Sequence, residues 1–197
     1  APVFGAESVF CLPQSSTFVA TFFVGALFLQ YPIGWLSDRM DRRVLIFGAS
    51  LICGLGGMIG LLLGSFFPML LLAGLLIGGM SNPLYSLLIA YTNDFLETDD
   101  MAAASGGLVF INGLGAVAGP LITGWAMGVI GPRGFFLFVA FLSMAMAAYA
   151  AYRMTQRAAP SVDETDSYAA VAPGGSPLAV NIAQEYALET SQEENEE

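Results

Sequence analysis

The sequence predicts an all-α, polytopic integral membrane protein with five full transmembrane helices. Of the 197 residues, 56% are hydrophobic and only 11% are charged, whereas about a quarter of the residues of a soluble domain are charged. Five long apolar runs contain no Asp, Glu, Lys or Arg, and an apolar run of about 20 residues spans the bilayer core as a helix. We therefore expect the lipid bilayer to surround most of the chain.

The apolar runs are continuous rather than alternating, so they favour helices over the strands of a membrane barrel. Short turns at 65–66 and 131–133 make the helices on either side antiparallel neighbours. The predicted spans are residues 17–37, 44–64, 67–91, 102–130 and 134–152.

The two ends of the chain differ from the spans. Residues 1–10 are too short to cross a bilayer and contain Glu7, so we interpret 1–16 as the end of a truncated transmembrane helix and an external turn at 12–16. The five-helix bundle is expected within 17–157. Residues 158–197 are rich in Pro, Gly, Ser and acids and contain no base, which favours an acidic, disordered tail.

The polar composition excludes several functions. Without His or Lys, the chain cannot form a Ser-His-Asp triad, an HExxH zinc site or a P-loop. The chain has six arginines against sixteen acidic residues, so it has no basic stripe that could bind the phosphates of a nucleic acid. The spans also lack the buried acid pair that an intramembrane enzyme could use. We therefore expect no enzyme, no metal, no cofactor and no nucleic-acid partner.

The arginines predict how the chain is oriented. Arg39, Arg42 and Arg43 lie between the first and second spans, and Arg153 and Arg157 follow the fifth. Five of the six bases therefore lie on one side, which the positive-inside rule assigns to the cytoplasm. The C-terminus is expected on that side.

The loop between the first two spans carries the most specific pattern in the sequence, Gly34-Trp35-Leu36-Ser37-Asp38-Arg39-Met40-Asp41-Arg42-Arg43. A positive-inside turn would be rich in arginine in any case, but this leaves the glycine and the interleaved acids unexplained. The spacing G-x-x-x-D-R-x-D-R-R resembles the cytoplasmic loop signature G-x-x-x-D-R-x-G-R-R of the major facilitator superfamily. The one departure is Asp41, where the family usually has glycine, and it affects the tight turn after Asp38.

This resemblance implies that the loop is a gate. Gly34 would let two helices approach closely, and Asp38 would lie at the N-terminus of a helix in the other half of a transporter, where the helix dipole favours negative charge. The three arginines of the loop would pair with cytoplasmic acids, and Asp94 at the end of the third span is the candidate partner. Such contacts would close the inward side and break when it opens.

The resemblance also implies a position within the family architecture. One span precedes the loop and four follow it, as in helices 8 to 12 of a twelve-helix transporter. The chain would then be a C-terminal half that begins with a remnant of helix 7, and its missing partner would be the N-terminal six-helix half. The strings Asn93-Asp94 through Met101 and Ala104-Ser105-Gly106-Gly107 look like the YcaD-like branch of bacterial members, which implies a bacterial inner membrane.

The function implied by the family is secondary transport of a small molecule by alternating access about a site near the membrane midplane. As one half, this chain would be unable to transport alone. The alternative is a structural or sensory membrane protein that binds a partner through its acidic tail. Deletion of 158–197 separates the two, because lost activity with intact membrane insertion would favour the alternative.

Polar residues inside the spans are candidates for the substrate cavity, because polar groups in a membrane usually face the protein interior, a partner or water. In the family, helices 7, 8, 10 and 11 wall the cavity in this half. The candidates are then Gln30, Asn82, Tyr85 and Asn112. A satisfied hydrogen bond between helices is the alternative for each of them.

Proline and glycine mark further features of the spans. Pro83 is expected to kink the third span and free the carbonyl of Gly79, and the Gly119-Pro120 pair is expected to kink the fourth. This pair resembles the Gly-Pro motif of facilitator antiporters, with ordinary close packing as the alternative. Glycines at four-residue spacing are expected to form helix-packing faces: Gly56, Gly60 and Gly64 in the second span, and Gly74 and Gly78 in the third.

Overall fold

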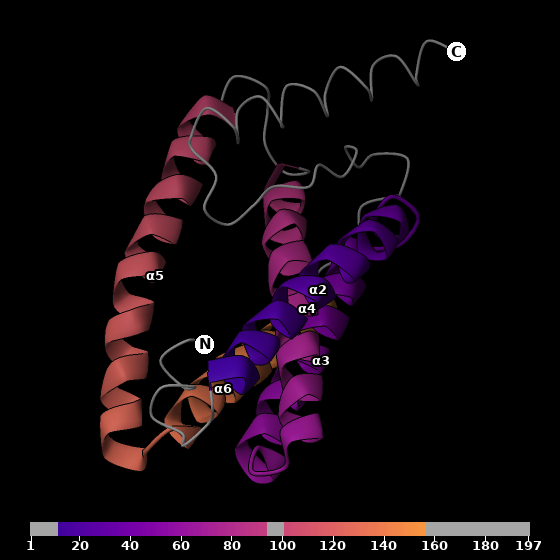
Figure 1. Ribbon diagram of the computed structural model, residues 1–197. Coiled ribbons are helices and arrows are strands. Elements are labelled where there is room, and N and C mark those ends of the chain that lie inside the picture. The colour runs from indigo at the N-terminus through magenta and orange to yellow at the C-terminus, as the bar shows by residue number, and fades with distance from the viewer. Residues whose placement is uncertain (1–11, 94–100, 157–197) are drawn as a thin grey trace.

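The computed structural model describes residues 12–93 and 101–156. Within these ranges the chain forms five helices and no strand (Figure 1). Each of the five is long and apolar enough to cross a membrane, by length and composition. The prediction of an all-α polytopic membrane protein is therefore confirmed. The helices are α2 (Leu12–Ser37), α3 (Arg42–Leu63), α4 (Phe67–Asn93), α5 (Met101–Ile130) and α6 (Arg133–Gln156).

Each of the five described helices is one to five residues longer than the predicted apolar run, and most of the added residues are polar or charged. α2 begins at Leu12, so residues 12–16 are helical and the external turn predicted there is wrong. Pro13 suits this start, since the first turn of a helix does not use its N–H groups. α6 continues through Arg153 to Gln156, where a base is favourable at the negative end of the helix dipole. The predicted helix remnant in 1–10 and the predicted tail at 158–197 lie outside the described residues.

Helices α2, α3, α4 and α6 form a packed bundle in which α4 lies against α2 and α3, and α3 also lies against α6. The centre of this bundle is aromatic and aliphatic. Phe136 of α6 is fully buried, and its ring meets the ring of Phe18 of α2 edge to face, with centroids 6.3 Å apart. Leu70 of α4 is buried in the same cluster.

Glycines allow α2 and α4 to approach closely. A Cβ at Gly78 would meet the backbone carbonyl of Phe22, and a Cβ at Gly74 would lie 2.8 Å from the ring of Phe18. The packing face predicted for these two glycines is confirmed. Gly25 of α2 completes the crossing, since its Cβ would meet the backbone of α4.

The glycines of α3 pack in the same way against α4 and α6. A Cβ at Gly56 would lie 3.0 Å from Leu76 of α4, and a Cβ at Gly60 would meet the ring of Phe136. The predicted packing face is confirmed for these two residues. Gly64 differs, because it is the C-cap of α3 and its nearest neighbour is the carbonyl of Gly60 in the same helix.

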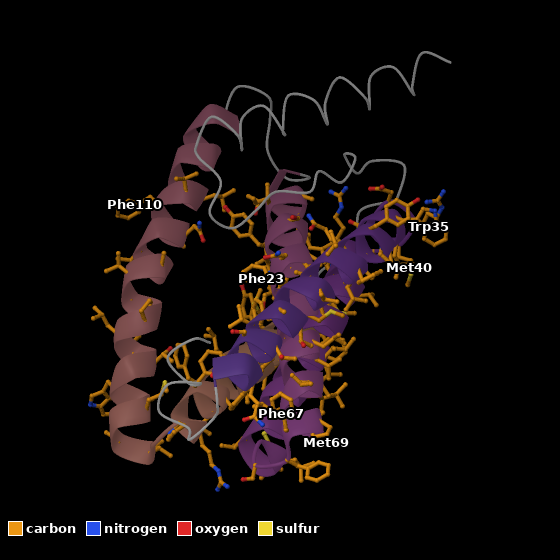
Figure 2. The ribbon with its side chains drawn as sticks, in the orientation of Figure 1. Phe23, Trp35, Met40, Phe67, Met69 and Phe110 are labelled. Carbon is orange, nitrogen blue, oxygen red and sulfur yellow. The ribbon has the colours of Figure 1, made fainter. Side chains whose placement is uncertain are left out.

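α5 stands apart from the other helices along most of its length (Figure 1). Leu108 and Val109 pack against Ile89 of α4 near its beginning. Between this contact and its C-terminal end, α5 presents large apolar side chains that are 60–72% exposed, and Figure 2 shows Phe110 directed away from the bundle. This apolar flank consists of Phe110, Ile111, Leu114, Val117, Leu121 and Trp125.

A tight corner joins α5 to α6. Gly131 has a φ of 83°. This left-handed backbone conformation commonly ends a helix, and glycine adopts it more readily than other residues. The N–H of Gly131 donates to the carbonyl of Met127 at 2.8 Å, and the N–H of Gly134 donates to the carbonyl of Gly131 at 2.8 Å. A Cβ at Gly134 would lie 2.6 Å from the carbonyl carbon of Ala126. The two helices therefore meet without space for a side chain at this point.

The prolines predicted as kinks lie inside continuous helices, Pro83 in α4 and Pro120 in α5. Pro83 is fully buried, whereas Pro120 is exposed. α2 contains a further proline, Pro32, which is also exposed.

Candidate functional site

The turn between α2 and α3 contains no glycine at position 41. Asp41 occupies this position and is the N-cap of α3. Its backbone angles are φ −55° and ψ 117°, and its side chain accepts a hydrogen bond of 2.9 Å from the backbone N–H of Arg43. Aspartate is among the best N-cap residues, since its carboxylate satisfies an N–H that the helix leaves unpaired. The departure from the family pattern at position 41 is thus compatible with a tight turn.

Arg42 is buried, with 2% of its surface exposed, and it connects three helix ends. Its Nε donates to Oγ of Ser37, the last residue of α2, at 3.3 Å, and its Nη1 donates to the carbonyl of Ala90 at 3.2 Å. The carbonyl of Ala90 is one of the last four of α4, which have no donor within the helix and carry its partial negative charge. Arg42 therefore holds the end of α2, the start of α3 and the end of α4 together.

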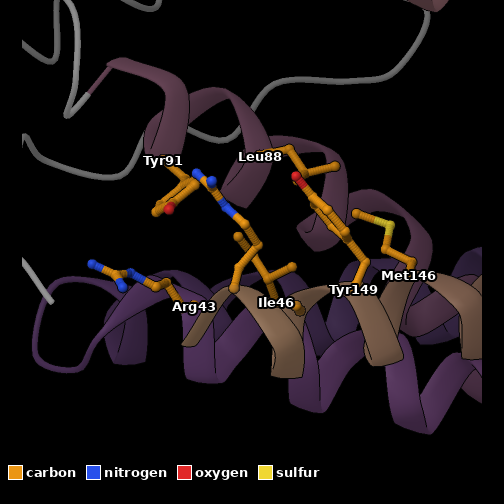
Figure 3. Close-up of a pocket in the computed structure, with 8 residues that line it drawn as sticks. Arg43, Ile46, Leu88, Tyr91, Met146 and Tyr149 are labelled. Atoms are coloured by element: carbon orange, nitrogen blue, oxygen red, sulfur yellow. The ribbon is translucent and has the colours of Figure 1, made fainter. Parts of the chain in front are cut away.

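Arg43 is also buried, at 5% exposure, and its Nε lies 3.8 Å from Oδ1 of Asp41. Its side chain lines a pocket together with Leu88 and Tyr91 of α4 and residues of α6 (Figure 3). Within the loop, Arg42 and Arg43 are therefore buried in the bundle, and the half-buried Asp41 lies against the start of α3.

Asp38 and Arg39 are exposed at the tip of the loop. The guanidinium of Arg39 lies over the ring of Trp35, 4.2 Å from its centroid, and Nη1 donates to the carbonyl of Trp35 at 3.2 Å. Gly34 lies buried one turn before Asp38, and its carbonyl accepts a 3.3 Å hydrogen bond from the backbone N–H of Asp38. The charged residues of the motif thus form an inner and an outer group, which the spacing alone does not reveal.

Asp94, the predicted acidic partner of the arginines, lies outside the described residues. Among the described residues, the partners of Arg42 include a hydroxyl and a backbone carbonyl. A backbone carbonyl has no signature in the sequence. The N-cap role of Asp41 does have one, because an aspartate shortly before an apolar helical run, here separated from it by Arg42 and Arg43, is a common helix start.

The arginines divide between two ends of the bundle. Arg43 and Arg153 line the same pocket, so the C-terminal end of α6 lies beside the start of α3. We call this region, which carries Arg39, Arg42, Arg43 and Arg153, the arginine-rich end. Nη2 of Arg133 donates to Oγ of Ser65 at 3.2 Å, which joins the α5–α6 corner to the α3–α4 turn.

The four cavity candidates are half-buried. Tyr85 packs beside Leu108 of α5 around Ile89, and Asn112 lies one helical turn beyond Leu108 on the same face of α5. The predicted alternative was a hydrogen bond between helices. In residues 12–93 and 101–156, the side chains of Gln30, Asn82 and Tyr85 make no hydrogen bond. Asn112 does have an interaction partner.

The fold and the loop define a polytopic α-helical membrane protein whose first two spans are joined by a capped, arginine-rich turn. The chain belongs to the major facilitator superfamily, because the model described as Major Facilitator Superfamily matches residues 10–182. It is also 27% identical over 143 residues to a protein of Bacillus subtilis (strain 168) named "Uncharacterized MFS-type transporter YfkF". The aligned part covers 70% of this chain and 35% of that relative, so the chain spans about a third of the relative's length.

Proposed function

We propose that this chain forms the C-terminal helical half of a secondary transporter that moves a small molecule by alternating access. Its family and its relative's name, an MFS-type transporter, support transport. The structural observation that carries the proposal is the position of Arg42, which joins α2, α3 and α4 at one end. Alternating access by rocking requires the helices of a bundle to move as one body, and a buried cation bonded to two other helix ends provides this coupling.

The outer group of the loop is the proposed gate. Asp38 and Arg39 lie at the exposed tip, whereas Arg42 and Arg43 are buried inside the bundle. We infer that Asp38 contacts the N-terminus of a helix in the N-terminal six-helix half, where the dipole attracts a carboxylate. This half would also cover part of the apolar flank of α5.

The half-buried polar residues Gln30, Asn82, Tyr85 and Asn112 are the proposed wall of the substrate cavity. Their side chains are uncharged, so they can offer hydrogen bonds to a small molecule without the desolvation cost of a buried charge. We further propose a bacterial inner membrane as the location, with the arginine-rich end and the C-terminus in the cytoplasm.

Cysteine accessibility tests alternating access without knowledge of the substrate. In the full-length protein with Cys11 and Cys53 replaced by serine, we expect Gln30→Cys to react with a membrane-impermeant thiol reagent added from either side of the membrane. Ala73→Cys is the control, because Ala73 is fully buried and should react from neither side. Reaction of Gln30→Cys from one side alone would contradict the proposal.

The gate has a separate test in the same cysteine-labelled protein. Asp38→Asn removes the charge and retains the size of the side chain, so we expect faster labelling of Gln30→Cys from the cytoplasmic side. Labelling rates equal to those of the parent protein would contradict the assignment of Asp38. In liposomes, this chain alone should give no saturable uptake of any compound that the full-length protein carries.

A further inference from the structure

A cavity of about 140 Å³ lies at the arginine-rich end, between α3, α4 and α6. Figure 3 shows its lining: Arg43 and Ile46 from α3, Leu88 and Tyr91 from α4, and Met146 and Tyr149 from α6. The ring of Tyr149 rises toward Leu88. The cavity is distinct from the exposed tip of the loop and from the half-buried amides of α2 and α4.

The rim of the cavity carries the charge. Arg43 is the second residue of α3, Arg153 lies in the last turn of α6, and Tyr91 lies two residues before the end of α4. Arg43, Arg153 and Tyr91 therefore line the cavity near the level where these helices end, and Tyr149 lies one helical turn further into α6. Asp41 lies 3.8 Å from Arg43 on the loop side of this rim.

The floor of the cavity is apolar, and it follows the rim with helical periodicity. Ile46 lies three residues further into α3 than Arg43, Leu88 lies three residues further into α4 than Tyr91, and Ala150 lies three residues further into α6 than Arg153. Residues three apart lie on one helix face. The cavity therefore changes from cationic to apolar over about one helical turn toward the membrane core.

We propose that this cavity binds the headgroup phosphate of an anionic phospholipid. Arg43 and Arg153 would hold the phosphate oxygens through charge-assisted hydrogen bonds, for which the planar guanidinium is well suited. The glycerol region would rest on Ile46 and Leu88. Basic pockets between transmembrane helices are suited to anionic headgroups, and an inorganic anion would gain nothing from the apolar floor.

The test measures lipid retention by the full-length protein in detergent, using native mass spectrometry with phosphatidylglycerol and phosphatidylcholine as probes. We expect preferential retention of phosphatidylglycerol and about tenfold weaker retention in Arg153→Gln, because a charge-assisted hydrogen bond is lost. Arg43→Gln should act in the same direction. Arg153 is half-buried rather than buried, so its variant remains informative if Arg43→Gln fails to fold.

The matched control is Arg39→Gln, which removes one exposed charge from the same end and should leave retention unchanged. An equal loss in Arg39→Gln would show only general attraction between charges and would overturn the proposal. Displacement of the lipid by millimolar inorganic phosphate would assign the cavity to free anions instead. Phosphatidylglycerol retention that appears only after deletion of 158–197 would assign the cavity to the chain's own acidic tail.

Discussion

The guanidinium of Arg42 donates a 3.2 Å hydrogen bond from Nη1 to the carbonyl of Ala90, 48 residues further along the chain. This contact brings a cation to the negative end of α4 and satisfies a carbonyl that lacks a donor within its helix. It also fixes the start of α3 to the end of α4 without an acidic side chain at that bond. The following predictions concern this end of the bundle and the packing below it.

Replacement of Arg42 by alanine should lower the free energy of unfolding by about 2–3 kcal/mol, because buried hydrogen bonds from a charged donor are lost. Arg42→Lys should recover part of the loss, since an ammonium keeps the charge but lacks the planar fork. Denaturant titration of the full-length protein in detergent, followed by circular dichroism, measures both. Arg39→Ala is the control and should cost about 0.5–1 kcal/mol, as expected for an exposed cation–π contact. Equal losses in the two alanine variants would rule out the bridging role of Arg42.

Asp41 should tolerate asparagine and glycine better than alanine. Asparagine retains an oxygen that can accept the N–H of Arg43, and glycine at an N-cap costs only a few tenths of a kcal/mol, whereas alanine costs about 1 kcal/mol. The ordering in thermal unfolding midpoints should be Asp, Asn, Gly, then Ala. A glycine variant less stable than the alanine variant would show that capping is not the role of this residue.

Gly78→Ala should destabilise the bundle, because its Cβ would meet the carbonyl of Phe22 and force α2 away from α4. We expect a loss of about 1–3 kcal/mol, typical of overpacking. Gly48→Ala in α3 is the matched control, since a Cβ there meets nothing within 4 Å. That variant should gain about 0.5–1 kcal/mol from better helix propensity. Similar changes at the two positions would contradict the close α2–α4 crossing.

Cysteines placed in the two turns should be labelled from opposite sides of the membrane. Met40 lies in the α2–α3 turn and Phe66 in the α3–α4 turn, and both are exposed. α3 separates the turns and is long enough to span the bilayer. In cysteine-free full-length protein in cells, Phe66→Cys should react with an impermeant maleimide and Met40→Cys should not. Labelling of both in intact cells would exclude a membrane-spanning α3.

Hydropathy predicted the existence, type and approximate bounds of all five helices, because an uncharged run long enough to span lipid has few alternatives. It failed at the start of α2, where Gln14, Ser15 and Ser16 interrupt the apolar run although the helix continues through them. Polar residues are compatible with the backbone hydrogen bonds of the first helical turns, but a hydropathy profile measures only apolar character and therefore places the helix start too late.

The sequence predicted the candidate site less completely than it predicted the helices. The motif identified Asp38, Arg39, Asp41, Arg42 and Arg43 as one group. Their separation into inner and outer residues depends on the position of α4, whose residue Ala90 contacts Arg42 from 48 residues further along the chain. The cavity between α3, α4 and α6 depends likewise on three helices that are distant in sequence. Local capping by Asp41 was the one feature of the site with a local signal.

The corner at Gly131 has a mechanical consequence for α5. This helix contains 30 residues and is therefore about 45 Å long at about 1.5 Å per residue. It is joined to α6 through the Gly131 and Gly134 contacts, so a rotation about that corner would move it as a lever arm. A tilt of about 10° there would displace the opposite tip by about 8 Å, given this length. A small rotation on one side of the membrane would thus be amplified into a large displacement on the other.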